Sequence, residues 1–132
     1  MNDISKDLIV LNDNGAWSWF MDERVIVHQG KLLVGSVRSS GQSYRFGDVA
    51  AGEIGACELT VYDLATGVSK VVVLHAPFEQ DDHNGPSLHV RPDGRVVAIY
   101  SRHSVERKVF WRISQSQDLR DRGPERVLEG SV

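Results

Sequence analysis

Short runs rich in β-branched residues dominate the chain, and turn-forming residues separate them. The run 25–27 is followed by 31–37 across Gly30, and 87–90 is followed by 95–100 across Asp93 and Gly94. Each turn carries a glycine, where a positive φ is needed, and each run is too short for a helix. Four further runs are expected to be strands, at 58–62, 69–74, 108–113 and 125–128. Because no window keeps a 3.6-residue period with caps at both ends, the sequence predicts an all-β protein of antiparallel hairpins.

These runs repeat in two groups of four. Residues 30–34 match residues 94–98, and the third and fourth runs of each group follow in the same order. Four antiparallel strands in a unit of roughly 50 to 60 residues are typical of propeller blades. We predict one partial domain over residues 1–132, with two four-stranded antiparallel blades of a β-propeller at about 11–75 and 81–128. A compact eight-stranded sandwich is the alternative architecture.

Two blades would form an incomplete ring, because propellers typically have four to eight. We therefore expect the chain to be a fragment or to assemble with copies of itself. Its 132 residues, 41% of them hydrophobic and 25% charged, fit one small domain or a piece of a larger one. A single cysteine, Cys57, excludes an internal disulfide, and its alternating surroundings predict a small strand residue.

The charge pattern gives no overall reason to expect nucleic acid or a membrane as a partner. The net charge is −3, and no stretch approaches the eighteen or so apolar residues of a membrane span. Arg102, Arg107, Lys108 and Arg112 form a basic cluster near His103, which we interpret as a solvated strand edge. The first seven residues are polar and acidic, unlike a secretory signal, so the cytoplasm is the default expectation unless a leader has been removed.

The spacing of two histidines marks the best candidate site. His83 lies before Asp93 and His103 lies after it at the same separation. If the hairpin keeps its register, the two imidazoles face each other at its open end, where cross-strand Cβ atoms are about 4.5–5.5 Å apart. Such a pair can perform acid–base chemistry near neutral pH, or bind a metal with Asp81 and Asp82 beside it.

A purely structural interpretation stays open for the same segment. Residues 81–86 are rich in turn formers, so His83 could belong to a turn and His103 to the surface after a strand. A slip of one residue would place the two rings on opposite faces. His28, His75 and His89 are expected to be structural or solvated.

Aromatic residues precede the first strand, at the place that residues 81–85 take in the second group. Trp17 and Trp19 share one face and could stack on a sugar ring, although aromatic residues at blade junctions are more often core. The chain has no phosphate-binding glycine loop, no Gly-x-Ser-x-Gly elbow and no zinc-type cysteine pair. Nucleophilic serine or cysteine chemistry therefore has no support. No cofactor is predicted, and no metal ligand is assigned.

The segments 12–24, 30–36, 81–91, 93–95, 100–103 and 123–125 follow one another in an order that resembles the BNR-repeat-containing propeller family. The resemblance spans about residues 11–127 and extends to the ulvan lyases of that group, which cleave a uronate-containing polysaccharide by β-elimination. It implies that His83 helps to abstract the proton at C5 and that His103 helps to neutralise the uronate carboxylate. It also implies secretion, and a tyrosine and an arginine from later blades that cannot be assigned here.

The leading hypothesis is thus the N-terminal part of a polysaccharide-active propeller, catalytically incomplete as a separate chain, whose partner is an acidic polysaccharide or oligosaccharide. The predicted catalytic residues are His83 and His103, and the predicted substrate-binding residues are Asn84, Arg102, Trp17 and Trp19. A non-catalytic carbohydrate-binding module and a structural propeller segment are the competing hypotheses.

Overall fold

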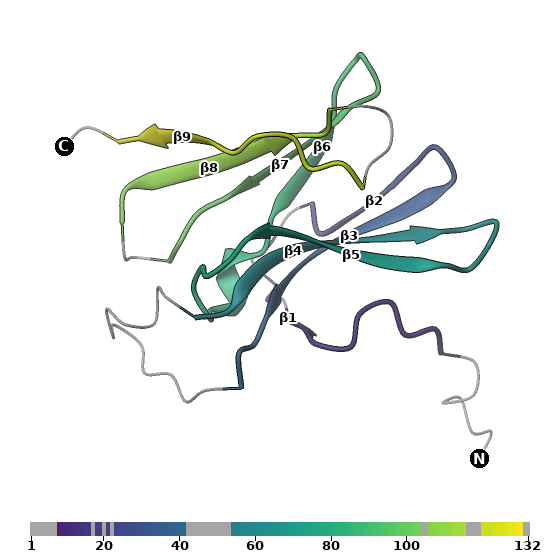
Figure 1. Ribbon diagram of the computed structural model, residues 1–132, viewed down its shortest axis with the longest axis horizontal. Helices are drawn as coiled ribbons and strands as arrows, with labels where there is room; N and C mark the ends of the chain where they lie inside the picture. Colours follow the sequence, from purple (N-terminus) through teal and green to yellow (C-terminus); the bar gives the residue numbers. More distant parts are fainter. Residues whose placement is uncertain are drawn as a thin grey trace.

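Two antiparallel β-sheets make up the computed structural model, which describes residues 8–16, 18–19, 21, 23–41, 54–103, 106–115 and 120–130 (Figure 1). The first sheet contains β1 (Gly15–Ala16), β2 (Val25–His28), β3 (Lys31–Arg38), β4 (Ala56–Asp63) and β5 (Ser69–His75). Strand β3 pairs with β1 and β2 along one edge and with β4 along the other, and β5 follows β4. The second sheet contains β6 (Ser87–Val90), β7 (Val96–Tyr100), β8 (Lys108–Ile113) and β9 (Arg126–Glu129), paired in chain order.

The all-β prediction is confirmed, and each of the eight predicted runs contains a strand. The short strand β1 is an addition that the β-branched runs did not predict, so the first sheet has five strands rather than four. Within the described ranges neither sheet closes on itself, and the assignment of the two sheets to propeller blades stays a prediction. Among the described residues no helix is long and apolar enough to cross a membrane.

Both sheets contribute to one apolar core, which explains why they fold together. Phe78, in the connection between the sheets, is fully buried, and its ring lies 5.6 Å from that of Tyr100 and 5.8 Å from that of Phe110. Truncating such a buried aromatic residue typically costs about 3–5 kcal/mol. The core cluster comprises Leu33, Cys57, Leu59, Val61, Val72, Leu74, Phe78, Leu88, Val96, Ala98, Tyr100 and Phe110.

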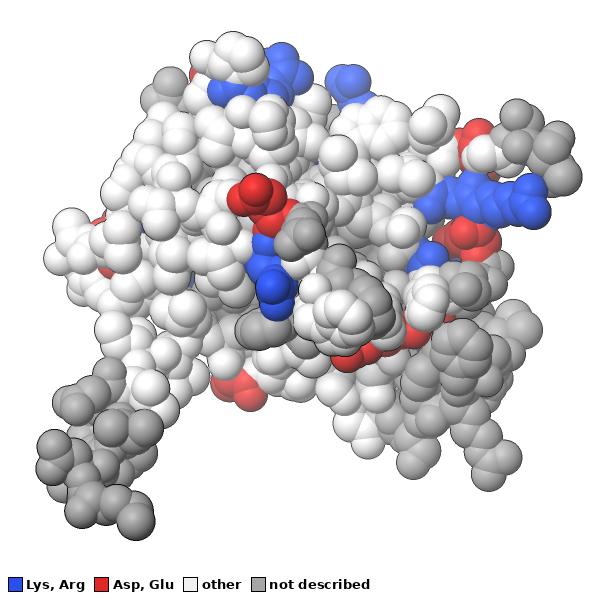
Figure 2. Space-filling model, turned by 180° about the vertical axis from the view of Figure 1, so that it is seen from behind, with Lys and Arg blue, Asp and Glu red and all other residues white. Residues whose placement is uncertain are grey.

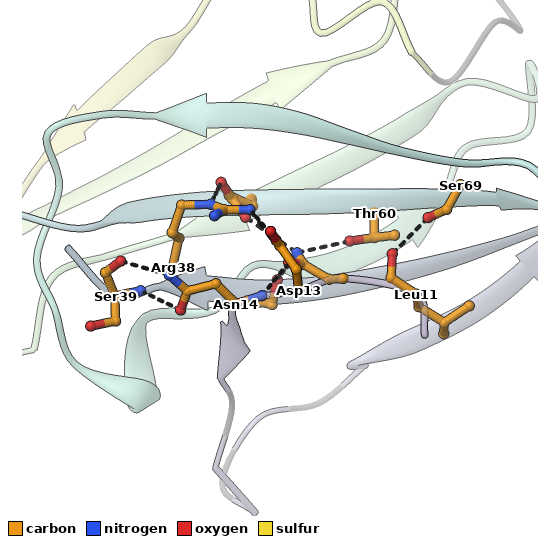
Figure 3. A network of polar contacts seen from close by, with 10 residues as sticks. Leu11, Asp13, Asn14, Arg38, Ser39, Thr60 and Ser69 are labelled. Atoms are coloured by element: carbon orange, nitrogen blue, oxygen red, sulfur yellow. Dashed lines mark hydrogen bonds and ion pairs between the residues drawn. The ribbon is translucent and has the colours of Figure 1, made fainter. Parts of the chain in front are cut away.

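A polar network fixes the N-terminal segment to the first sheet (Figure 3). The Nε of Arg38 donates to buried Glu58 Oε1 at 2.6 Å, and its Nη2 lies 3.0 Å from Asp13 Oδ1. Asn12 Nδ2 donates to Glu58 Oε2 and to Thr60 Oγ1, each at 3.2 Å. Because Glu58 is only 1% exposed, these partners are what make its burial tolerable.

A second polar group links β5 to the second sheet. Tyr100 Oη donates to Glu125 Oε1 at 2.7 Å, His75 Nδ1 lies 2.9 Å from the same oxygen, and Arg112 Nε donates to Leu74 O at 2.7 Å. Burial, together with the hydrogen bond to Glu125, raises the pKa of Tyr100 above its ordinary value. Arg112, counted in the basic cluster from the sequence, therefore connects the two sheets.

The connection from β5 to β6 packs tightly on β3, and this packing positions the candidate site. A Cβ at Gly35, in the middle of β3, would lie 2.6 Å from Pro86 O, so only glycine fits beneath this backbone. A Cβ at Gly85 would lie 1.6 Å from the Cε of Met21. The segment that carries His83 is thus held against the first sheet and continues into the first strand of the second.

Candidate functional site

The register of the hairpin β6–β7 is centred on Asp93, as the sequence predicts. Ser87 pairs with Ile99 and Val90 pairs with Val96. Beyond the ends of these strands, the rings of His83 and His103 lie with centroids 4.7 Å apart and planes inclined by 38°. The prediction that the two imidazoles lie together at the open end of the hairpin is confirmed.

A short 3₁₀ helix, η3 (Asp82–Asn84), presents His83, and Asp81 is its N-cap. Asp81 Oδ1 accepts a hydrogen bond from His83 N at 2.9 Å, the interaction for which aspartate is favoured at this position. Residues 81–86 therefore include the short helical turn that their composition favours. The turn and the histidine pair are parts of one arrangement.

The carboxylate of Asp81 bridges the two histidines. Its Oδ1 lies 2.7 Å from His83 Nδ1, and its Oδ2 lies 2.9 Å from His103 Nδ1. Burial raises the pKa of Asp81, but hydrogen bonds from the His83 backbone and from both rings outweigh it, and the net shift is downward. An ionised carboxylate can only accept, so each ring carries a proton on Nδ1, and in the neutral ring Nε2 holds the lone pair.

Exposure differs sharply between the carboxylate and the rings that it orients. The Asp81 side chain is 6% exposed, whereas those of His83 and His103 are 35% and 36% exposed. Because each Nδ1 points at Asp81, the Nε2 of the same ring points in a different direction. The arrangement is a fixed pair of imidazoles on a buried anion, able to accept or donate protons and to meet an anionic or metal ligand.

A second carboxylate, that of Glu79, holds the backbone behind the histidines. Glu79 is fully buried, and its Oε2 accepts hydrogen bonds from Asn84 Nδ2 and from His103 N, each at 2.7 Å. Its Oε1 has no hydrogen-bond partner in the described part of the chain. Glu79 thereby joins η3 to the segment after β7, the two segments that carry His83 and His103.

The predicted substrate-binding residues lie in different settings. Asn84 is 2% exposed and bonded to Glu79, so it supports the turn from behind. Arg102 donates to Glu106 Oε1 at 2.9 Å, and its guanidinium lies 5.2 Å from the centroid of the Phe78 ring. Whether these two side chains contact a substrate stays a prediction.

Trp19 is 76% exposed, and the residue before it contacts the site: Ser18 N donates to Asp82 O at 3.2 Å. The exposed indole thus belongs to a segment anchored on the turn that carries His83. Trp17 lies outside the described residues.

Sequence reasoning did not single out Asp81 as a bridge and missed Glu79 altogether. Asp81 carried a signal, since an aspartate that begins a turn before a histidine is a typical cap. Glu79 carried none, because a charged residue beside Phe78 gives no indication of burial.

The remaining histidines and the cysteine lie in other environments. His28 Nε2 lies 2.9 Å from Gly94 O, His75 packs against Phe78, and His89 is exposed on β6. Cys57 is fully buried, and burial raises the pKa of its thiol, as expected for a structural residue.

Charge is distributed without a broad basic surface on the face seen in Figure 2, where the Lys and Arg side chains among the described residues stand singly or beside acidic groups. Lys108 Nζ, from the predicted basic cluster, lies 3.2 Å from Glu106 Oε2 and 3.7 Å from Glu129 Oε1. A solvated, charge-paired strand edge accounts for these contacts.

A scan of the sequence against protein-family models found no match, and a search of curated proteins found none either.

Proposed function

We propose that the chain is part of a polysaccharide-active propeller and that His83 and His103 bind a uronate-containing glycan. The observation that carries this proposal is the bridge by Asp81, which holds two partly exposed imidazoles 4.7 Å apart on one buried carboxylate. β-Elimination beside a carboxylate needs a base for the α-proton and a group that neutralises the carboxylate. Two oriented imidazoles supply both kinds of group.

In this proposal the rings take different parts. The Nε2 of His83 accepts the proton from C5 of the uronate, the electrons of that C–H bond form the C4=C5 double bond, and the C4–O bond breaks, its oxygen taking a proton from solvent. His103, with a second proton on Nε2, donates a hydrogen bond to the carboxylate, which makes the proton at C5 more acidic. Asp81 orients both rings through their Nδ1 atoms. The family resemblance implies that a tyrosine and an arginine complete the reaction, so we expect this chain to bind the glycan and to cleave it only when those groups are supplied.

The competing proposal is a carbohydrate-binding module without catalysis, and one observation favours it. Trp19 is 76% exposed on a segment that is hydrogen-bonded to Asp82. An exposed indole beside polar side chains is a common platform for a sugar ring, because its flat apolar face stacks on the ring.

The test incubates the chain with a uronate-containing polysaccharide such as ulvan, and follows both binding and the ultraviolet absorbance of the unsaturated product. We expect His83→Ala and His103→Ala to weaken binding about tenfold, which is about 1.4 kcal/mol. The control variant is His89→Ala, which removes an exposed histidine on β6. We expect it to bind the polysaccharide as the wild type does. Absorbance that appears with wild type and persists in His83→Ala would overturn the role of His83 as the base. Binding that all three variants retain would overturn the site.

A further inference from the structure

The structure assigns a second capacity to the same segment: a site for one divalent transition-metal ion, made by His83, His103 and the carboxylate of Asp81. The candidate ligand atoms of these three residues all lie within 4.8 Å of one another. This inference is independent of the proposed glycan binding, because it rests only on the donor set and its geometry.

The donor types suit a metal such as zinc. Two imidazole nitrogens and a carboxylate oxygen form one of the common protein ligand sets for Zn²⁺, with the remaining position filled by water or another ligand. Here Asp82 can fill it, since its Oδ1 lies 3.1 Å from His83 Nδ1 and its side chain is half exposed. Two carboxylates and two neutral rings carry a charge of about −2, which balances a divalent cation.

The distances allow an ion to bind after a local rearrangement of the two rings. Around a tetrahedral zinc ion with bonds of about 2.0–2.1 Å, neighbouring ligand atoms lie roughly 3.3 Å apart. The corresponding separations are 2.7 Å from His83 Nδ1 to Asp81 Oδ1 and 2.9 Å from His103 Nδ1 to Asp81 Oδ2. An ion therefore needs each ring to move by about half an ångström from its own carboxylate oxygen. It also needs the two rings, which now meet different oxygens of Asp81, to turn toward one common point, and the ligand atoms of the three residues already lie within 4.8 Å of one another.

Binding changes the tautomer of each ring. Without metal, Nδ1 carries the proton that is donated to Asp81. When Nδ1 coordinates the ion, that proton is lost from Nδ1 and one is taken up at Nε2 from solvent, so the ring stays neutral and no net proton is released. The buried Glu79 holds the backbone of His103 throughout, which keeps both ligand-bearing segments in place.

The experiment is a calorimetric titration of the chelator-treated chain with zinc chloride, in the absence of any glycan. We expect one ion per chain, at least about tenfold weaker binding in His103→Ala and in Asp81→Asn, and unchanged binding in His89→Ala. No binding by the wild type, or equal affinity in His103→Ala and His89→Ala, would overturn the inference.

A second measurement keeps the test decisive if a variant fails to fold. In the wild-type chain, zinc is expected to move the ¹⁵N resonances of the His83 and His103 rings to the Nε2-protonated pattern, while those of His89 stay in place. Ring resonances that do not change at saturating zinc would overturn the site. Either result leaves the glycan proposal to its own test, since the two titrations share no ligand.

Discussion

Replacing Asp81 by asparagine keeps the N-cap of η3 and the hydrogen bonds to His83, but it changes the group that faces the His103 ring. The remaining oxygen can still accept from His83 N and His83 Nδ1, because both bonds use Oδ1 in the wild type. The amide NH₂ then takes the place of Oδ2 and faces His103 Nδ1, which is itself a donor. Two donors cannot pair, so we expect the His103 ring to move its proton to Nε2 and to accept from the amide.

The size of the effect follows from what is lost. A hydrogen bond to a charged group contributes about 1.5–3 kcal/mol, and the His103 ring is about one third exposed, so water replaces part of it. We expect Asp81→Asn to lower the free energy of unfolding by about 1–2 kcal/mol. Asp81→Ala also removes the cap and the bond to the His83 ring, and about 3–4 kcal/mol is expected.

Urea denaturation gives the free energies of unfolding, and ¹⁵N shifts of the histidine rings give the tautomers. Asp82→Asn is the matched control, because the Asp82 side chain is half exposed and its Oδ1 lies 3.1 Å from His83 Nδ1; its cost is expected to stay below about 1 kcal/mol. If Asp81→Asn and Asp82→Asn cost the same, or if His103 keeps its Nδ1 proton in Asp81→Asn, the bridge does not orient the pair.

Three further predictions concern the surroundings of the site. Gly35→Ala places a Cβ 2.6 Å from Pro86 O, a backbone atom that cannot turn aside, and a loss of about 2–3 kcal/mol is expected in urea denaturation. Arg38→Met leaves Glu58 buried without its charged partner, and we expect thermal and urea denaturation to report a loss of about 2–3 kcal/mol, less than for a fully buried pair because Arg38 is one third exposed. Trp19→Ala removes an exposed side chain, so stability is expected to change by less than about 0.5 kcal/mol while calorimetry shows roughly two- to tenfold weaker glycan binding.

Local patterns predicted the strands and the hairpin register well, because both depend on neighbours in the sequence. Short β-branched runs between turn residues located the eight strands, and the turn at Asp93 and Gly94 set the pairing that brings His83 and His103 together. Strand β1 was not predicted, because its two residues, Gly15 and Ala16, are too few to form a recognisable run.

The carboxylates behind the histidines could not be predicted in the same way. Glu79 is buried only because the chain after β5 turns inward beside Phe78, and its partners Asn84 and His103 are brought to it by the fold. The bridge by Asp81 likewise depends on a ring from the segment that follows β7. Such contacts are properties of the tertiary arrangement, which a pattern along the chain does not contain.

The central claim, that the bridged histidines recognise a uronate carboxylate, is tested most directly by comparing two ligands. Calorimetry with an unesterified uronate oligosaccharide and with its methyl ester measures the contribution of the carboxylate alone. We expect the wild-type chain and His89→Ala to prefer the unesterified ligand about tenfold, and His103→Ala to lose that preference. Equal affinity of the wild-type chain for the two ligands would contradict the claim.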